Sequence, residues 1–223
     1  MKRWTEATLV ALLVAGCTPP PPRPTEPHGI PTSATVKELA AAIAADAKRS
    51  DHEPDAKIRA ELAAEASRDA ATCLAREPQA VACLYGRALA LGLEARAHPT
   101  RAGELLNQML GGLADAEAAD PYYDEAGPAR VRALVLIRAP GWPLGPGDAE
   151  AGLVAARRAA TLRPQYPPNL LALAEALAKT GDSNGAWENY ERARALAQGL
   201  PAGTDRDGWL READDALRTQ SGR

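Results

Sequence analysis

Three prolines at a regular spacing divide the chain into units of equal length. Pro78, Pro121 and Pro164 follow one another at intervals of 43 residues, and each stands between two alanine-rich segments. A proline ends the helix before it and permits another helix to begin just after it. Equal spacing of such breaks predicts stacked pairs of helices, the arrangement of helical-repeat proteins.

The segments around the prolines have the composition of helices. Runs such as KELAAAIAADAKR and LLALAEALAK combine strong helix formers with few β-branched residues, and no short window alternates as a strand does. We therefore expect an all-α domain over residues 32–219, with residues 220–223 as a disordered tail. Helices are predicted at Ser33–Lys48, Asp55–Arg76, Ala80–Arg96, Arg101–Ala118, Asp124–Arg138, Asp148–Leu162, Asn169–Thr180, Asn184–Gln198 and Asp207–Thr219. These helices make about four hairpins and a C-terminal capping helix.

The last unit carries a specific repeat pattern. Small and apolar residues recur at helical spacing on both sides of a glycine turn at Gly181: Leu170, Leu173, Ala174, Leu177, Ala186, Tyr190 and Ala193. The pattern resembles the tetratricopeptide repeat, in which small residues at Ala174 and Ala186 let two helices approach closely. The earlier units match only in fragments, and longer interhelix loops are expected to explain 43 residues where about 34 are usual. The whole domain is thus predicted to be a tetratricopeptide-like stack.

The first 31 residues have the pattern of an exported and anchored chain. Lys2 and Arg3 precede an apolar stretch over residues 7–15, which is too short to span about 30 Å of hydrocarbon. The sequence LVAGC, ending at Cys17, resembles the lipobox of bacterial lipoproteins. It predicts a signal peptide over residues 1–16, acylation of Cys17 and a proline-rich disordered linker over residues 17–31. The alternative is an ordinary signal peptide with a stray cysteine, and Thr18 favours the outer membrane, facing the periplasm, over the inner one.

The two remaining cysteines lie at equal distances on either side of Pro78. In a helical hairpin Cys73 and Cys83 would face each other across the turn. The cell envelope is an oxidising compartment. We predict a disulfide between them, with two buried free thiols as the alternative.

Three segments in the middle of the chain carry a second resemblance. They are, in this order, AADPYYDEAGPARV, APGWPLGPGD and RPQYPPNLLALAEAL. Together they resemble the T-component family of TRAP transporters, tetratricopeptide lipoproteins that accompany a periplasmic solute-binding protein. The resemblance covers roughly residues 73–197 and departs from the family at Ala133, where relatives often carry glycine. It implies a protein that docks on the solute-binding protein, helps pass it a small apolar or amphipathic ligand, and can assemble as a homo-oligomer.

Aromatic side chains in these segments are the predicted ligand or partner contacts. Aromatic rings supply a large contact area with little loss of rotamer entropy. The candidates are Tyr122, Tyr123, Trp142 and Tyr166. Trp187 and Tyr190 stand on a repeat helix, where packing is the simpler explanation for Tyr190. The neighbouring acids Asp120, Asp124 and Glu125, like Asp148, are interpreted as helix caps.

Other classes of function find little support in the sequence. A formal net charge of −3 and the lack of a basic stripe argue against nucleic-acid binding. His28, His52 and His98 show neither metal-ligand spacing nor a nucleophile partner, so no metal, cofactor or enzymatic activity is predicted. The alternative function is an interaction scaffold for outer-membrane or pilus assembly. A scaffold requires an open, polar concave groove, whereas transport requires an apolar cavity, expected here beside the Trp142 loop.

Overall fold

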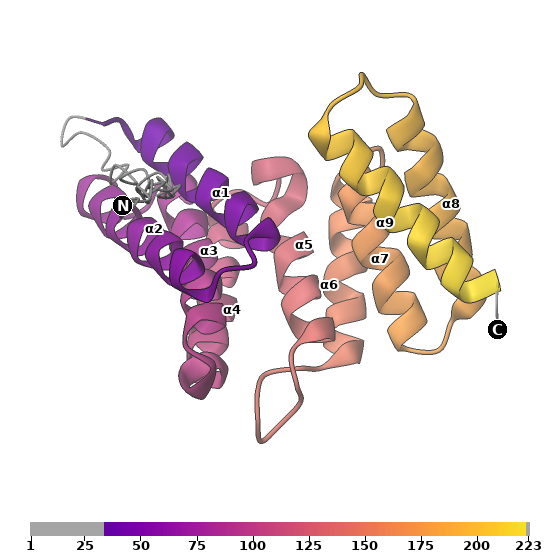
Figure 1. Cartoon of the computed structure of the whole chain (residues 1–223), viewed down its shortest axis with the longest axis horizontal. Helices are drawn as coiled ribbons and strands as arrows, with labels where there is room; N and C mark the ends of the chain where they lie inside the picture. Colours follow the sequence, from indigo (N-terminus) through magenta and orange to yellow (C-terminus); the bar gives the residue numbers. More distant parts are fainter. Residues whose placement is uncertain (1–33, 222–223) are drawn as a thin grey trace, which may run out of the picture.

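The computed structural model describes residues 34–221, and these residues form helices joined by turns (Figure 1). The helices are α1 (Val36–His52), α2 (Ala56–Arg76), α3 (Val81–Ala97), the short 3₁₀ helix η1 (Pro99–Arg101), α4 (Ala102–Ala119), α5 (Tyr123–Arg138), α6 (Ala149–Leu162), α7 (Pro167–Lys179), α8 (Ser183–Gln198) and α9 (Thr204–Ser221). The all-α prediction is confirmed. The predicted signal peptide, linker and acylated Cys17 lie outside the described residues.

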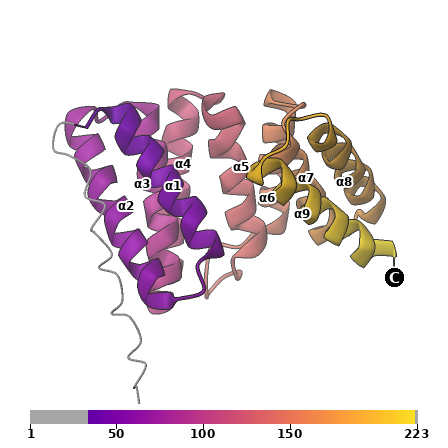
Figure 2. The same ribbon diagram turned by 45° about the horizontal axis from the view of Figure 1, so that its top comes forward.

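Consecutive helices pair as hairpins that stack side by side (Figure 1; Figure 2). The pairs are α1 with α2, α3 with α4, α5 with α6 and α7 with α8, and α9 packs on α8 and α7. Each odd-numbered helix also contacts the next odd-numbered one, whereas no two even-numbered helices in the described part of the chain pack together. The odd-numbered helices therefore form one inner layer. The prediction of four hairpins and a terminal helix is confirmed.

The final hairpin is built as the repeat pattern predicts. The buried residues of the repeat pattern belong to one core that also includes α9. They are Leu170, Ala174, Leu177, Ala186, Tyr190 and Ala193. Gly181 has a φ of 93°, a conformation that glycine adopts without steric cost. The Asp182 side chain then caps α8 by accepting from the Gly185 N–H at 2.9 Å. Tyr190 is a packing residue.

Several helix ends differ from the predicted ones by a few residues. Thr35 caps α1 in a reciprocal box with Glu38, and the helix runs on to His52. α9 runs to Ser221, so residues 220 and 221 belong to the helix instead of the predicted tail. In α1 no helix-breaking residue comes before Pro54, and in α9 none comes directly after Thr219. Both helices extend further than predicted, because propagation adds one hydrogen bond for each residue ordered.

The explanation offered for the 43-residue repeat is only half right. In the second unit a long loop over residues 139–148 separates α5 from α6, as expected. In the first unit α3 has 17 residues and α4 has 18, and only a short turn joins them. The extra length there lies in the helices, because the alanine- and leucine-rich sequence meets no breaker until Pro99.

The side chains form separate cores on the two sides of the boundary between α4 and α5. One core joins α5 to α9 and includes Ile137 and Leu170. A small cluster of alanines also joins α5 to α6. The remaining cores lie among α1 to α4, and α5 reaches them only through partly buried side chains, among them Tyr123, Val131 and Val135. The most extensive packing of α5 is on α6, and across the boundary it packs on α4 and only slightly on α3. This weakly packed junction between α3 and α5 is called the seam below.

The structure joins Cys73 of α2 to Cys83 of α3 in a disulfide. Their Cα atoms are 5.3 Å apart, and both side chains are fully buried beside Leu39. Within residues 34–221, no helix combines the length and the apolar character needed to cross a bilayer.

Candidate functional site

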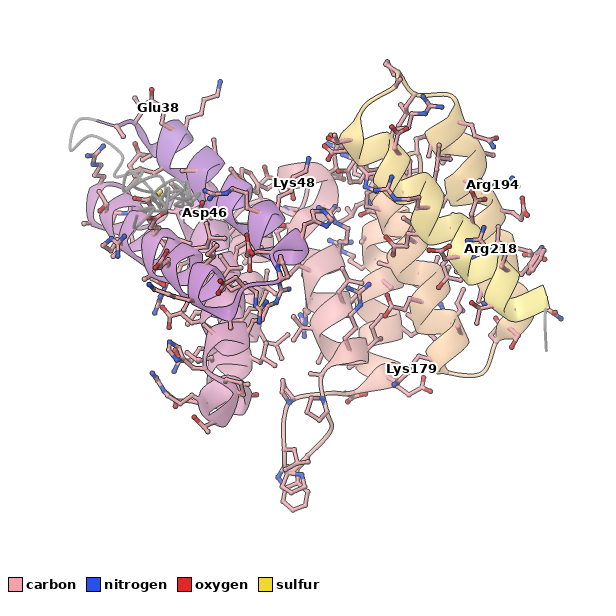
Figure 3. All side chains as sticks on the ribbon, viewed as in Figure 1. Glu38, Asp46, Lys48, Lys179, Arg194 and Arg218 are labelled. Atoms are coloured by element: carbon pink, nitrogen blue, oxygen red, sulfur yellow. A yellow bond between two sulfur atoms is a disulfide. The ribbon has the colours of Figure 1, made fainter. Side chains whose placement is uncertain are left out.

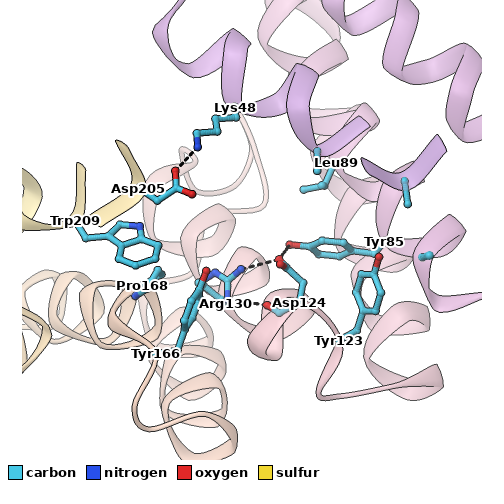
Figure 4. A pocket seen from close by; sticks show the side chains of 13 residues that line it. Lys48, Tyr85, Leu89, Tyr123, Asp124, Arg130, Tyr166, Pro168, Asp205 and Trp209 are labelled. Carbon is cyan, nitrogen blue, oxygen red and sulfur yellow. Dashed lines mark hydrogen bonds and ion pairs between the residues drawn. The ribbon is translucent and has the colours of Figure 1, made fainter. Parts of the chain in front are cut away.

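Four aromatic side chains meet in a cleft at the seam, three from α3, α5 and α9 and one from the residue that precedes α7 (Figure 4). Its cavity measures about 380 Å³, within the range typical of small-molecule sites. The aromatic walls are Tyr85, Tyr123, Tyr166 and Trp209. Charged groups at the floor and the mouth are Asp124, Arg130, Lys48 and Asp205, and the remaining lining consists of Ala40, Ala44, Ala82, Leu89 and Pro168.

The floor of the cleft is built on a left-handed turn at the start of α5. Asp124, Glu125 and Ala126 have φ values of 48°, 54° and 63°, a conformation that costs a residue with a Cβ about 1–2 kcal/mol. The right-handed helix begins only after them, with Pro128 in its first turn, where no N–H is needed. The predicted helix start at Asp124 is therefore wrong.

Gly127 allows this turn to fold back on itself. A Cβ at that position would lie 2.6 Å from Asp124 Oδ2 and 2.7 Å from Tyr85 Oη. Such distances are too short for carbon and oxygen, so any larger residue would push the Asp124 carboxylate away from α3.

Arg130 and Asn169 hold the turn in place. The Arg130 guanidinium donates to the carbonyl oxygens of Asp124 at 3.2 Å and Glu125 at 3.1 Å, and to Asn169 Oδ1 at 3.1 Å. The Asn169 amide donates in turn to the Glu125 carbonyl at 3.0 Å. Asn169 is fully buried and Arg130 nearly so. These bonds satisfy the carbonyl groups that the left-handed turn removes from the α5 ladder.

The Asp124 carboxylate connects the two sides of the seam. Its Oδ2 accepts from Tyr85 Oη of α3 at 3.0 Å and from Arg130 Nη2 of α5 at 2.8 Å. The interpretation of Asp124 as a helix cap is wrong, because the turn directs its side chain into the cleft. Asp120 does cap locally and accepts from the Tyr122 N–H at 2.8 Å.

The aromatic rings pack edge to face around this ion pair. Tyr85 and Tyr123 lie 5.5 Å apart between centroids, and so do Tyr166 and Trp209. The Arg130 guanidinium carbon stands 5.1 Å from the Tyr166 centroid. Edge-to-face pairs and cation–π contacts of this kind each add about 0.5–1.5 kcal/mol. The walls are therefore held in a defined geometry.

An ion pair spans the mouth of the cleft. Lys48 of α1 lies on the side of that helix that faces α9 (Figure 3), and its Nζ pairs with the Asp205 carboxylate. α1 and α9 are not otherwise packed together in the described residues. Both side chains are more than half exposed, so the pair contributes at most about 1 kcal/mol.

A second, more apolar cavity adjoins the first at the seam. It measures about 450 Å³ and shares Leu89 with the aromatic cleft. Its apolar walls come from α3, α4 and α5, and include Leu106, Met109, Val131, Leu134 and Val135. This second cavity is called the apolar groove below. At its edge, Arg96 pairs with Asp51 at 2.8 Å.

Burial keeps the phenols of the cleft protonated. It raises the pKa of Tyr85, and the neighbouring Asp124 carboxylate raises it further. Burial is also the main cause of the raised pKa of Tyr123 and of Tyr166, where Arg130 opposes it. At neutral pH all three hydroxyls are hydrogen-bond donors.

We expect the free energy of unfolding to fall as pH rises above about 10, where phenols of the unfolded chain ionise. The folded chain keeps its protons there, so it binds more protons than the unfolded chain and loses stability. Denaturant unfolding at a series of pH values measures this. In Tyr85→Phe the decline should be shallower by about 1.4 kcal/mol per pH unit. Equal slopes in both chains would contradict a raised pKa of Tyr85 in the folded chain. The difference in the free energy of unfolding at neutral pH measures the effect of losing the hydrogen bond from the Tyr85 hydroxyl.

The structure brings together only two of the four predicted contact residues. Tyr123 and Tyr166 line the cleft. Tyr122 is half exposed outside it, with the Arg163 guanidinium 4.7 Å from its ring centroid. Trp142 is 90% exposed in the loop that projects from the stack between α5 and α6 (Figure 1), and it lines neither the cleft nor the apolar groove. Within residues 139–148, Ala139 alone lines the apolar groove, so the loop borders that cavity at its first residue and not at Trp142.

Sequence reasoning missed Tyr85, Trp209 and Arg130. Tyr85 sits in an alanine-rich helix and Trp209 on the helix interpreted as a cap, so neither stood out. Two signals were present in the sequence: the pair Gly127–Pro128 inside a predicted helix, and the amide of Asn169 at the head of an apolar stripe.

In the part of the chain that the structure describes, no group of three or more histidine, cysteine, aspartate or glutamate side chains is placed to hold a metal ion.

Comparison with known proteins bears on the fold alone. No protein-family model matches the chain. No curated protein sequence matches it significantly. Among solved structures, the crystal structure of a thermophilic tetratricopeptide-repeat protein from Thermus thermophilus superposes with a TM-score of 0.54 and 21% identity, over 82% of this chain and 92% of that one. The chain therefore has a tetratricopeptide-like fold.

Proposed function

We propose that the protein is an accessory of a TRAP transporter that binds an apolar or amphipathic ligand and delivers it to a solute-binding protein. It would act at the periplasmic face of the outer membrane, held there by a lipid on Cys17. The observation that carries the proposal is the aromatic cleft that adjoins the apolar groove at the seam. A hydrophobic site with a few converging polar groups is the usual form of a small-molecule site.

The position of the cleft suits a ligand that must be released again. One wall belongs to α1 and α3 and the other to α5, α7 and α9. The two sides have separate cores, so small changes at the seam would open the cleft without unfolding either side. Release to a partner then requires only that the partner stabilise the open arrangement.

The exposed loop over residues 139–148 is the proposed contact with the solute-binding protein. Trp142 is 90% exposed and Leu144 76% exposed. Backbone bonds hold the loop: Gly147 N–H donates to the Pro140 carbonyl at 2.9 Å, and Leu144 N–H to the Gly141 carbonyl at 3.0 Å. A tryptophan presented by a pre-organised loop is a typical hot spot of protein interfaces.

Trp142→Ala tests this contact. Immobilised protein should capture the solute-binding protein from a native envelope extract at least about tenfold less well when Trp142 is replaced. Stability should change by less than about 0.5 kcal/mol, since the side chain packs on little. Trp187→Ala, on α8, is the matched control and should capture normally. Equal capture by the wild-type chain and both variants would contradict the proposed contact at Trp142. Recovery of assembly-machinery proteins alone would contradict the transport role.

The lipid anchor has its own test. Replacing Cys17 with alanine should move the protein from the membrane fraction to the soluble fraction. A variant that stays in the membrane would contradict acylation of that cysteine.

An interaction scaffold is the second candidate, and the charges on the inner layer favour it. Arg138 donates to Glu175 at 2.8 Å, and Glu212 of α9 lies 4.0 Å from the same guanidinium. A mixed-charge lining of this kind suits an extended peptide in a concave repeat surface. Binding of peptides with no binding of amphiphiles would favour this candidate.

A further inference from the structure

We propose that the cleft is selective for an uncharged amphiphile, with a hydroxyl-bearing head in the aromatic cleft and an aliphatic tail in the apolar groove. This inference rests on the proposed ligand-binding role and adds the chemical class and the orientation of the ligand. The groups that carry it are the two ion pairs of the cleft, the polar atoms between them and the groove beyond Leu89.

The charges of the cleft balance one another. Its lining holds two cations and two carboxylates, and each cation is paired with a carboxylate: Lys48 with Asp205, and Arg130 with Asp124. No net charge is left to attract an ion. A charged head group would have to break one of these pairs.

An anionic head gains nothing by displacing the existing carboxylates. Arg130 is already bonded to four oxygen atoms, of Asp124, Glu125 and Asn169, and only 11% of its side chain is exposed. At Lys48 a ligand carboxylate would replace that of Asp205 and leave Asp205 unpaired in the cleft. In such an exchange, the favourable free energy of the new ion pair is about equal to that of the pair it breaks.

A cationic head is disfavoured for the opposite reason. The Arg130 guanidinium already stands against the Tyr166 ring at 5.1 Å, and it would repel a second cation at the same aromatic face. The Asp124 carboxylate that could attract the cation is neutralised by Arg130 at 2.8 Å.

Donors and an acceptor remain open for an uncharged polar head. Within residues 34–221 no hydrogen bond is recorded for the hydroxyls of Tyr123 and Tyr166 or for the indole N–H of Trp209, and all three residues line the cavity. On Asp124 both recorded bonds fall on Oδ2, which leaves Oδ1 to accept. A hydroxyl both donates and accepts, so it can satisfy Asp124 and the aromatic donors together.

The apolar groove adjoins the cleft and offers the tail a place beside the head. Leu89 lines both cavities, and beyond it Val131, Leu134 and Val135 succeed one another along α5. This surface offers no uncharged polar side chain before the ion pairs at its edge. An aliphatic chain would fill it without stranding a polar group.

The test compares three amphiphiles with the same tail by titration calorimetry: monodecanoylglycerol, decanoate and decylammonium. The full chain carrying Cys17→Ala is used, so that no detergent competes. Monodecanoylglycerol should bind at least about tenfold more tightly than either ion. Tighter binding of either ion would overturn the inference and leave the proposed function standing. Binding of none of the three would overturn both.

Two sets of variants test the orientation. Tyr123→Phe with Tyr166→Phe keeps both rings and should weaken monodecanoylglycerol about tenfold, whereas Tyr190→Phe, in the core of α7 to α9, should not. Val135→Trp should fill the groove, weaken monodecanoylglycerol and leave the short-tailed monobutanoylglycerol unchanged, which also shows that the variant is folded. Equal weakening of both esters by Val135→Trp, or no effect of the double tyrosine variant, would overturn the assigned orientation.

Discussion

Replacing Arg130 with methionine is expected to lower the free energy of unfolding by about 3 kcal/mol. Methionine retains much of the apolar stem but donates no hydrogen bond. The carbonyl oxygens of Asp124 and Glu125, the Asn169 amide oxygen and the Asp124 carboxylate all lose a donor at 2.8–3.2 Å. The three carbonyl-type acceptors lie where little water reaches, because Asn169 is fully buried and Arg130 nearly so. Denaturant unfolding monitored by circular dichroism measures the change.

Arg132→Met is the matched control on the same helix. Within the described residues Arg132 makes no recorded hydrogen bond or ion pair and is partly exposed, so its loss should cost less than about 0.5 kcal/mol. If Arg130→Met lowers the free energy of unfolding no more than Arg132→Met does, the left-handed turn does not depend on the Arg130 guanidinium. Because Arg130 also stands against Tyr166, Arg130→Met should weaken amphiphile binding as well, whereas Arg132→Met should not.

Removing the disulfide is expected to cost about 3 kcal/mol in the chain-entropy model of cross-links. The bond closes a loop with a sequence separation of 10 between α2 and α3. Without it the unfolded chain gains the freedom of that loop, and the hairpin around Pro78 is held by packing alone. The double variant Cys73→Ala with Cys83→Ala avoids leaving a free thiol, and thermal unfolding compares it with the wild-type chain.

A reducing agent separates this effect from a change in packing. It should destabilise the wild-type chain and have no effect on the double variant. If the wild-type chain is also insensitive while a thiol assay finds both cysteines reduced, the two residues are buried free thiols, the alternative that the sequence left open.

The two predictions concern a local feature of the chain and a set of long-range contacts. The cysteine pair followed from spacing about a turn, because the geometry of a hairpin is local. The Arg130 cluster joins α3, α5 and α7 across 39 residues in each direction. No local rule specifies such contacts, and the residues concerned resemble ordinary helix caps and surface charges.

The aromatic residues show the same division. Tyr190 was correctly placed in the core because it belongs to a repeat whose spacing fixes which face is buried. Tyr122 and Tyr123 are adjacent, yet only Tyr123 lines the cleft, since the turn that follows them decides which ring faces α3. Trp142 was predicted to contact the ligand or partner, yet its side chain is exposed and lines neither the cleft nor the apolar groove.

The amino-acid sequence by itself determined the helices, the order of the hairpins and the tetratricopeptide-like stack. These depend on helix propensity, proline breaks and apolar periodicity, which act over a few residues. Only the tertiary structure decided where the site lies. The seam arises because α5 packs extensively on α6 but barely on α3. The left-handed turn persists because Arg130 and Asn169, brought together by folding, offset its cost. Both depend on contacts between residues far apart in the chain, and local preference carries no information about them.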